Sequence, residues 1–483
     1  MSLTIQDFLA FVPFTVLIGW AVLLIVVDLF IPKERKGLTA LLAAIGLIIT
    51  LGLCVIPLIQ HTAAFNGMIV YDGFAVFLCI LFLGCGLAGI ALAYDYLKRM
   101  HIDRSEYYIL LLFSVSGMML MSMAADMILV FMALELLSIP LYVMAGFARP
   151  RLESEEAALK YFLLGAFAGG FVVYGVALIF GASGSTALAE IVAAVRSGEA
   201  NLTVLAVGAA LVLVGLGFKV AAVPFHMWTP DVYQGSPTAV TAFMAVGAKA
   251  AGFAALLRVF VTAFPALTQD ITPILWVLAA LTMILGNVVA IAQADIKRLL
   301  AYSSIAHAGY ILTALVPYAQ AALSRDVVAS ALFYLLAYAF TTFGAWAVVI
   351  ALEKSEGKGL AISDYAGLAR RHPALAAAMT VFMLSLTGIP PTLGFVGKFY
   401  LFRTVIEGGF IDLALIGVIT SLISAYYYLR VVVVMYMWDG APEAHREVWL
   451  TATTLAAAIG TVVLALFSTP LFRWASQAVM LAF

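Results

Sequence analysis

The sequence predicts an all-α, polytopic membrane protein with about 14 transmembrane helices. Of its 483 residues, 65% are hydrophobic and only 11% are charged, whereas an average soluble domain has about 45–50% apolar and about 25% charged residues. The apolar residues fall into segments of about 20, which is the length that a helix needs to cross a bilayer. This composition excludes a soluble enzyme, and the net charge of −1 provides no attraction to nucleic acid.

The apolar segments follow one another along the chain with short connections. The longest polar connection, EKSEGKGLAISDYAGLARRH, precedes the twelfth segment, so we expect no separate soluble domain. The predicted spans are 8–30, 38–59, 72–94, 107–124, 126–147, 156–181, 203–232, 238–262, 272–292, 297–318, 327–352, 373–405, 411–438 and 447–470.

The basic residues predict the orientation of these helices. Connections after odd-numbered spans hold 15 of the 25 lysines and arginines, and connections on the opposite side hold 5. Because cytoplasmic loops are enriched in Lys and Arg, we expect both termini on the periplasmic side of a bacterial inner membrane. The 15 residues are Lys33, Arg35, Lys36, Lys98, Arg99, Arg104, Arg149, Arg151, Lys297, Arg298, Lys354, Lys358, Arg370, Arg371 and Arg446; the 5 are Arg196, Arg258, Arg325, Arg403 and Arg473.

Four of the charged residues within predicted spans carry charges that we expect to be buried in the membrane. Glu135 lies near the middle of the fifth span, Lys219 in the seventh, Lys249 in the eighth and Lys398 in the twelfth. Each charge at the bilayer centre costs about 2.5–3.5 kcal/mol, so four unpaired charges would cost on the order of 10 kcal/mol. Such residues normally face a wet cavity or a partner, and we expect Glu135 to pair with Lys219.

Buried lysines suit proton transfer. Burial destabilises the charged amine, so that the group can gain and lose a proton, and a nearby carboxylate favours the charged form again. His307 in the tenth span can also relay protons, although a hydrogen-bonded core histidine fits the sequence equally well. Snorkelling or static ion pairing is the alternative for the charged residues, above all for Lys160 and Arg430 near helix ends. The sequence does not decide whether these two or His226 take part.

Two spans carry helix-breaking residues. Pro224 lies in the seventh span, and the run Thr-Gly-Ile-Pro-Pro at 387–391 lies in the twelfth. Proline removes a backbone donor and clashes with the preceding turn, and freed carbonyls at membrane depth are tolerated where they line a cavity or are buried in protein. Because the breaks are five spans apart, they predict two inverted five-helix repeats. We therefore divide the chain into 1–106 (helices 1–3), 107–262 (helices 4–8), 272–438 (helices 9–13) and 447–483 (helix 14 and tail).

The cysteines argue against a cofactor. Cys54, Cys79 and Cys85 all lie in apolar segments, and an iron–sulfur cluster normally takes four thiolates. The chain has no CxxC or CxxCH motif and no Walker lysine loop. We therefore expect neither a cofactor nor a metal ion in this chain.

Four segments of the chain carry a distinctive pattern, namely MALELLSIPLYVMAGF, GFKVAAVPFHMWTPDVYQGSPTAVTAFMAVGAKAAGFAALLRVF, DIKRLLAYSSIAHAGYIL and GIPPTLGFVGKFYLF. These segments resemble the antiporter-like subunit N family of respiratory complex I, the proton-pumping NADH:quinone oxidoreductase. The resemblance extends over nearly the whole chain, and the run 217–260 is highly specific. We expect no long C-terminal lateral helix of the kind that the largest related subunit carries, and Lys398 stands where the middle related subunit typically has glutamate.

The resemblance implies a proton path along buried polar residues. Glu135 and Lys219 match the family's charged pair, Lys249 its central lysine and Lys398 its terminal lysine, while His307 lies in a helix of the hydrated axis. The implied partners are membrane lipid and other membrane-arm subunits, namely the antiporter-like subunit M and the small subunits K and J. FMN and iron–sulfur clusters are expected in partner subunits.

We therefore expect a proton-translocating subunit whose proton movement is coupled to quinone reduction elsewhere in the complex. A subunit of a multisubunit cation/proton antiporter is the main alternative, because it shares the fold and the buried lysines. A scaffold that carries no ions is a third possibility. The run 217–260 favours the first function over the second, and proton exchange at the lysines would distinguish both from the third.

Overall fold

The chain folds into an almost entirely helical membrane protein, as the composition predicts. The computed structural model describes residues 5–32, 35–56, 62–320, 322–354, 358–478 and 480. Among these residues, 12 helices are long and apolar enough to cross a membrane. The predicted count of 14 also includes α13 (Ile296–Leu315) and the interrupted pair α16 (Pro373–Thr387) and α17 (Leu393–Glu407), which fall outside that set.

The remaining elements comprise long helices, which agree closely with the predicted spans, and short elements that connect them. They are α1 (Ile5–Asp28), α2 (Gly37–Cys54), β1 (Thr62–Ala64), β2 (Ile69–Tyr71), α3 (Gly73–Arg99), α4 (Glu106–Met123), α5 (Met127–Ala145), α6 (Leu152–Ser183), α7 (Leu188–Ser197), α8 (Leu202–Val220), α9 (Trp228–Gly235), α10 (Thr238–Phe243), the π-helical turn η3 (Met244–Ala248), α11 (Lys249–Ala263), the 3₁₀ turn η4 (Pro265–Leu267), α12 (Thr268–Ile291), α14 (Ser324–Leu352), the 3₁₀ turn η5 (Ile362–Tyr365), α15 (Leu368–Arg371), α18 (Ile411–Met437), α19 (Val448–Leu466) and α20 (Ser468–Gln477).

Short polar side chains fix where several helices begin. Asp72 caps α3 by accepting a hydrogen bond from the Ala75 amide, and Asn201 caps α8 in the same way. Asp126 accepts from two amides of α5, and Asp295 accepts from the Arg298 amide of α13. Each cap satisfies a backbone donor that the first helical turn leaves free.

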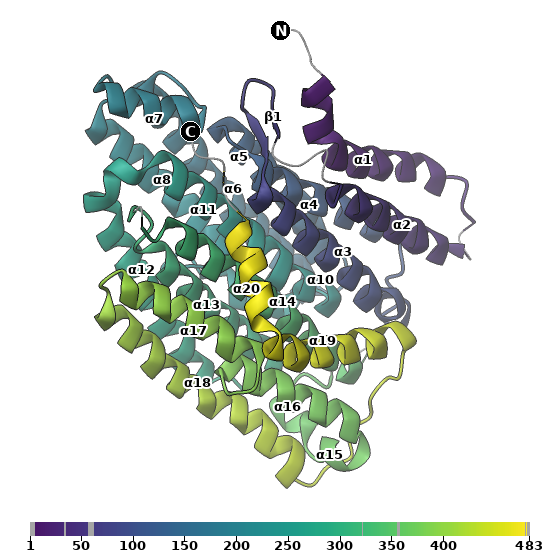
Figure 1. Cartoon of the computed structure of the whole chain (residues 1–483). Helices are drawn as coiled ribbons and strands as arrows, with labels where there is room; N and C mark the ends of the chain where they lie inside the picture. Colours follow the sequence, from purple (N-terminus) through teal and green to yellow (C-terminus); the bar gives the residue numbers. More distant parts are fainter. Residues whose placement is uncertain are drawn as a thin grey trace.

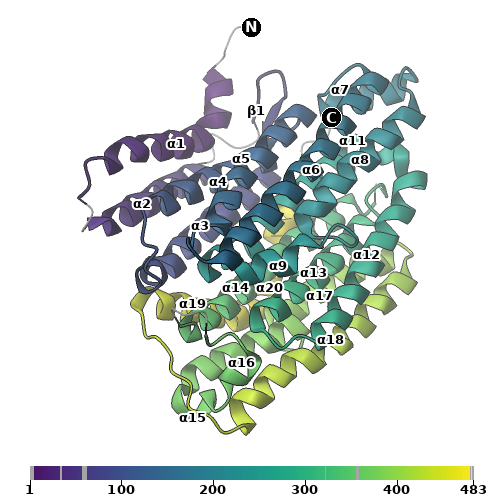
Figure 2. The ribbon, with the colours of Figure 1, turned by 180° about the vertical axis from the view of Figure 1, so that it is seen from behind.

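The helices lie side by side in one body (Figure 1). The N-terminal helices α1 and α2 form one flank and α18 lies at the opposite flank, an arrangement that the reverse view also shows (Figure 2). The centre is the segment Thr238–Ala263, whose most apolar window is completely buried, and α14 is nearly as deeply buried. Charged residues on these central elements are therefore shielded from lipid.

Both predicted helix breaks are present. The seventh span is interrupted between the end of α8 at Val220 and the start of α9 at Trp228, and Ala221 ends α8 with a positive φ of 64°. The twelfth span is interrupted between Thr387 and Leu393, and Gly388 ends α16 with a φ of 90°. The π-helical turn η3 immediately before Lys249 was not predicted; such turns are frequent at functional sites.

Two isolated backbone pairings occupy equivalent places in the two halves. Asp126, the cap of α5, pairs with Ala187 just before α7, and Asp295, the cap of α13, pairs with Ala361 just before η5. The first pairing lies at the end of the molecule that carries α7, and the second lies towards the end that carries α15 (Figure 1). Equivalent pairings at opposite ends agree with the predicted inversion, and the repeat boundaries stay a prediction.

Some sequence-based expectations need correction. Arg258 and Lys297, each counted as a loop cation, are buried side chains. Lys297 was counted on the predicted cytoplasmic side of the membrane and Arg258 on the opposite side. The excess of basic residues on the cytoplasmic side therefore remains. Lys33, also counted, and positions 57–59 of the second span lie outside the described residues. The short helices α7, α9, α15 and α20 and the β1–β2 hairpin were not predicted, because elements this short carry little hydrophobic periodicity.

Candidate functional site

Lys219 lies in the last turn of α8, directly before the helix break. Its side chain is only 4% exposed. Its Nζ donates to Ser138 Oγ at 2.7 Å and to Tyr161 OH at 3.1 Å, and it lies 5.4 Å from the centroid of the Tyr161 ring. The end of a helix carries partial negative charge, so this position also favours the ammonium. Its hydrogen-bond partners are neutral hydroxyl groups.

The expected direct ion pair between Lys219 and Glu135 is not formed. Within the described residues, Glu135 and Lys219 form no ion pair, although the two charges interact electrostatically. Glu135 is partly exposed, and its carboxylate lies beside Gly169 of α6. Ser138, about one turn further along α5, accepts the hydrogen bond from Lys219 instead. The sequence identified the two elements correctly and misplaced the contact by one turn.

Lys249 is the first residue of α11 and lies at the centre of the molecule. Its side chain is 2% exposed. Its Nζ donates to Ser304 O of α13 at 2.5 Å and to Val220 O at 3.4 Å. Val220 is the last residue of α8 and the direct neighbour of Lys219. Lys249 therefore connects the first helix break with α13.

His307 lies one turn after Ser304 on α13, and both of its ring nitrogens are hydrogen-bonded. Nδ1 is 2.6 Å from Tyr334 OH and Nε2 is 3.1 Å from Tyr428 OH. The side chain is 2% exposed. A cavity of about 10 Å³ adjoins His307 and Tyr334, and the residues of the second helix break at Ser385 and Leu386 also line it. A site that holds one water needs about 10–15 Å³, so this space is at the lower limit for one water.

Lys398 lies in α17, and the second helix break provides its acceptors. Its Nζ donates to Leu386 O, Thr387 O and Ser421 Oγ, each at 2.9 Å. The first two acceptors are carbonyls at the end of α16, which an uninterrupted helix would use internally. The Nζ also lies 4.5 Å from the centroid of the Tyr310 ring. The ring of Tyr310 in turn contacts His307, with 5.5 Å between the ring centroids.

Contacts of these residues, in part through the backbone of Val220 and of α13, connect Lys219, Lys249, His307 and Lys398 through the buried centre, and we call this series the lysine line. Val220 joins Lys219 to Lys249, Ser304 joins Lys249 to the helix of His307, and Tyr310 lies between His307 and Lys398. Each of the three lysines, and His307, can accept and release a proton. The line crosses from the first helix break to the second, and Glu135 lies beside its first member.

Lys160 and Arg430, whose part in proton transfer the sequence leaves open, make contacts that stabilise the fold. Lys160 forms ion pairs with Glu156 and Asp231, each at 2.7 Å, and is 40% exposed. The Arg430 guanidinium donates to Ile291 O and Gln293 O at the end of α12. Both arrangements favour the structural alternative. His226 lies in the connection between α8 and α9, and its Nδ1 has no hydrogen-bond partner among the described residues.

A second group of buried charges was missed in the sequence. Lys297, at the start of α13, donates to Ser236 O at 2.7 Å, and Glu353, at the end of α14, accepts from Tyr96 OH at 3.4 Å. Both side chains are 2% exposed, and their charges interact. They lie at the ends of predicted spans, where charged residues are normally solvated, so only their burial distinguishes them.

Buried side-chain oxygens without a hydrogen-bond partner among the described residues, here called orphaned oxygens, lie between the Lys297–Glu353 group and Lys249. In the described part of the chain, five buried side-chain oxygens of this region have no hydrogen-bond partner: Ser236 Oγ, Thr238 Oγ1, Ser304 Oγ, Thr342 Oγ1 and Glu353 Oε2. The Tyr233 and Tyr338 hydroxyls both lie beside Ser304. Buried polar atoms almost always have a protein or water partner. This concentration of orphaned oxygens therefore marks a region suited to ordered water.

A buried ion pair stabilises the first half of the molecule. Arg258 of α11 donates to Asp72 through both terminal nitrogens, at 2.6 and 2.9 Å, and to Ser122 O at 2.6 Å. Both side chains are fully buried. The bidentate geometry joins α11 to the start of α3 and the end of α4. We assign this pair a structural role, since it lies away from the lysine line.

No metal centre is visible in the parts of the chain that the structure describes. No group of three His, Cys, Asp or Glu residues there could hold a metal ion. Cys54, Cys79 and Cys85 are buried free thiols.

The chain is similar to proteins of known families over most of its length. Residues 124–424 match the family "NADH:quinone oxidoreductase/Mrp antiporter, TM". NADH-quinone oxidoreductase subunit N of Chloroflexus aggregans is 48% identical over 98% of this chain and 97% of its own length. The corresponding subunit of Trichlorobacter lovleyi is 45% identical over 96% of this chain and 95% of its own.

Solved structures give the same result for the fold. A chain of respiratory complex I from Thermus thermophilus with bound aureothin has a TM-score of 0.82 and 35% identity, with 96% of this chain and 99% of that chain covered. A chain of the Mrp complex from Dietzia sp. has a TM-score of 0.85 at 21% identity, covering 98% and 97%. The second likeness concerns the fold alone.

Proposed function

Since the chain belongs to the subunit N family of NADH-quinone oxidoreductases, we propose that protons move along the buried line Lys219–Lys249–His307–Lys398. The protein is a membrane subunit of a proton-pumping NADH:quinone oxidoreductase, within the wider NADH:quinone oxidoreductase/Mrp antiporter family. The antiporter alternative is secondary, because the Mrp relative is only 21% identical.

The observation that carries the proposal is the chemistry of the lysine acceptors. Within the described residues, Lys219, Lys249 and Lys398 donate only to hydroxyl and carbonyl oxygens. A carboxylate in direct contact would hold each proton firmly. Neutral acceptors orient the ammonium and leave its proton free to move. Three buried amines of this kind on one line suit transfer better than static ion pairing does.

We arrange the proposed steps of the relay along these contacts. A proton leaves Lys249 towards the Ser304 end of the line, where His307 accepts it at one ring nitrogen and releases another proton from its second nitrogen. Tyr334 and Tyr428 hold the two nitrogens in position. The small cavity beside His307 opens towards the carbonyls that bind Lys398 and gives room for a bridging water.

Protons reach Lys249 through the region of orphaned oxygens. Lys297 and Glu353 form its outer end, and Ser304 lies two turns, about 10 Å, further along α13. Ser236, Thr238 and Thr342 lie between them and bind the ordered waters of this entrance. Glu353 serves as the group that exchanges protons with the outer water.

The assembly of the protein follows the family. It is a multi-pass protein of a bacterial inner membrane with both termini in the periplasm, which places Glu353 and Lys297 on the cytoplasmic side. Its partners are the antiporter-like subunit M and the small subunits K and J. Partner subunits hold FMN and the iron–sulfur clusters.

Replacing Lys249 with arginine tests the relay. Arginine keeps the positive charge and effectively never loses its proton in a protein. Lys249→Arg should therefore assemble and pump at least tenfold more slowly, with quinone reduction slowed in parallel. Acidification and quinone reduction are measured in vesicles, and the content of the complex is checked on a native gel.

Lys160→Arg is the matched control. It makes the same exchange in a partly exposed ion-pair network, and pumping should be unchanged. Full pumping by Lys249→Arg together with loss of assembly in Lys249→Ala would show a structural cation and contradict the relay.

A further inference from the structure

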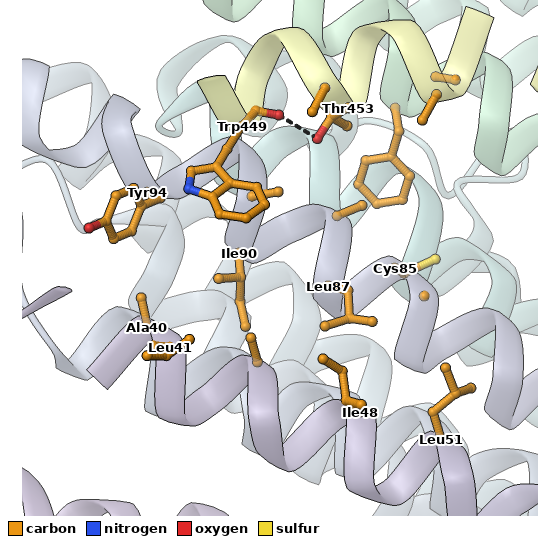
Figure 3. A pocket seen from close by; sticks show the side chains of 18 of the residues that line it. Ala40, Leu41, Ile48, Leu51, Cys85, Leu87, Ile90, Tyr94, Trp449 and Thr453 are labelled. Carbon is orange, nitrogen blue, oxygen red and sulfur yellow. Dashed lines mark hydrogen bonds between the residues drawn. The ribbon is translucent and has the colours of Figure 1, made fainter. Parts of the chain in front are cut away.

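A wide apolar groove lies on the flank of the molecule, away from the lysine line. It has a volume of about 1270 Å³, and α2, α3, α14 and α19 form its walls. Figure 3 shows Tyr94 and Trp449 towards one end of the groove and Leu51 and Cys85 towards the other. Gly84 on α3 has no atom within 4 Å of the position that a Cβ would take, so small residues keep the groove open.

One end of the groove is cationic. Arg35, Lys36 and Lys98 line it together with Asp103. Asp28 neutralises Lys36 through an ion pair of 2.7 Å. Within the described residues Arg35 and Lys98 have no ion-pair partner, and Lys98 lies over the Tyr94 ring, 3.6 Å from its centroid. Two positive side chains are therefore available for an anion.

The same end also offers a hydrogen-bond acceptor. Asp103 Oδ1 is buried without a hydrogen-bond partner among the described residues. Burial raises the pKa of the Asp103 carboxyl, an effect that Lys98 partly opposes. A ligand that carries both a phosphate and a hydroxyl donor would match the two cations and this acceptor.

The apolar part of the groove is long enough to hold the acyl chains of one bilayer leaflet. Its α2 wall extends from Leu38 to Leu51, which is about 20 Å at 1.5 Å per residue. Half of the hydrocarbon core measures about 15 Å. Tyr94 and Trp449 lie at the cationic end, as aromatic residues do at membrane–water interfaces.

We propose that this groove binds an anionic glycerophospholipid of the phosphatidylglycerol class. Its phosphate lies between Arg35 and Lys98, a headgroup hydroxyl donates to Asp103, and its acyl chains extend along α2 and α3. Charge complementarity at one end selects a lipid over a transmembrane helix of a partner subunit, because apolar helices offer no anion at this depth.

Photo-crosslinking in the assembled complex tests the occupant. A photoreactive benzoyl-phenylalanine replaces Ile48, which is 56% exposed and lines the groove. The complex is reconstituted in vesicles of phosphatidylcholine and phosphatidylglycerol in equal amounts, and the adducts are identified by mass. We expect phosphatidylglycerol to be captured in several-fold excess. The same probe at Leu422, which is 75% exposed on the opposite flank, should capture both lipids equally.

Paired variants test the cationic end. Arg35→Gln combined with Lys98→Gln should abolish the excess of phosphatidylglycerol. Arg371→Gln combined with Arg446→Gln removes the same charge outside the groove and should preserve the excess. Capture of both lipids in equal amounts at Ile48, or an excess that persists without Arg35 and Lys98, would overturn the proposal.

A steric variant covers the case in which the charge variant does not assemble. Gly84→Trp fills the groove and should prevent capture at Ile48, whereas Gly52→Trp, also in open space but outside the groove, should not. Continued capture of phosphatidylglycerol in Gly84→Trp contradicts the proposal. An adduct between Ile48 and another subunit would identify a protein partner in place of the lipid.

Discussion

At the scale of single residues, the neutral environment of the buried lysines determines their chemistry. A buried ammonium without a carboxylate contact keeps its charge only through dipoles and hydroxyl groups, such as Ser138 and Tyr161 around Lys219. Removing an ion from water costs several kcal/mol even after relaxation. Burial disfavours the charged form of each lysine, whereas the surrounding dipoles and hydroxyl groups favour it. The charged and neutral forms of the amine therefore differ little in free energy, which reversible proton transfer requires.

Glu135 should influence Lys219 through space. Glu135→Gln removes a negative charge that acts on Lys219, so the neutral form of Lys219 becomes more favourable and proton transfer should slow several-fold. A double-mutant cycle of Glu135→Gln and Lys219→Ala, read out as pumping rate, should give a coupling energy of about 0.5–3 kcal/mol. Strictly additive effects would show that the two residues act independently.

Glu353 should control proton entry. Glu353→Gln keeps the size of the side chain and removes its ability to exchange a proton, so pumping should fall about tenfold or more. Glu443→Gln is the matched control, because Glu443 is exposed and pairs with Lys354, the residue directly after Glu353. Equal pumping rates in the two variants would exclude the entrance through Glu353.

Sequence reasoning identified the residues of the line better than their contacts. A lysine within 20 apolar residues is conspicuous, so Lys219, Lys249 and Lys398 could be found directly. Ser304, Tyr334 and Tyr428 could not, because a serine or tyrosine is ordinary in a membrane helix and only the packing of α13 against its neighbours shows their role. The contact of Lys219 with Ser138 depends on a helix rotation that spacing alone does not fix.

At the scale of elements, the two helix breaks provide carbonyl oxygens that accept hydrogen bonds from Lys249 and Lys398. Val220 O at the end of α8 accepts from Lys249, and Leu386 O and Thr387 O at the end of α16 accept from Lys398. Proline and glycine predicted where each helix ends, since both act locally on the backbone. They did not predict the π-helical turn η3, whose sequence MAVGA contains no proline and only Gly247 as a glycine.

Gly388 should be sensitive to a single methyl group. Its φ is 90°, and an added Cβ would lie 3.0 Å from Lys398 Cδ and 3.5 Å from Nζ. Gly388→Ala should therefore displace Lys398 from its carbonyl acceptors and slow pumping several-fold in the assembled complex, measured as acidification of vesicles.

Gly409→Ala separates backbone strain from this contact. Gly409 has a φ of 87° and no atom within 4 Å of the Cβ position. Both variants incur about 1–2 kcal/mol of strain from the left-handed conformation, but only Gly388→Ala reaches the lysine. If the two variants lose pumping to the same extent, strain alone explains the loss.

At the scale of the whole molecule, composition predicted the fold class and most spans to within a few residues. The burial pattern could not be predicted in the same way. Glu353 and Lys297 look like solvated helix ends in the sequence, and Arg258 looks like a loop cation, yet tertiary packing buries all three. Where the helices lie relative to one another decides which charges meet water, and that information is non-local.

The orientation in the membrane can be checked with introduced cysteines. Ser197 and Ala441 are exposed and belong to connections that the basic residues assign to opposite sides. An impermeant maleimide added to intact cells should label Ser197→Cys, and should label Ala441→Cys only after the membrane is permeabilised. The described native cysteines are buried and serve as background. The reverse labelling pattern would invert the topology.

The carbonyl acceptors at the helix breaks also affect how this protein can evolve. A carbonyl belongs to the main chain, so no substitution at Val220, Leu386 or Thr387 deletes the group that binds Lys249 or Lys398. Side chains at these three positions can therefore change between lineages as long as the helices still end where they do. Selection should act instead on the lysines and on the residues that interrupt the helices. Diverged relatives should therefore differ at the three acceptor positions and still conduct protons.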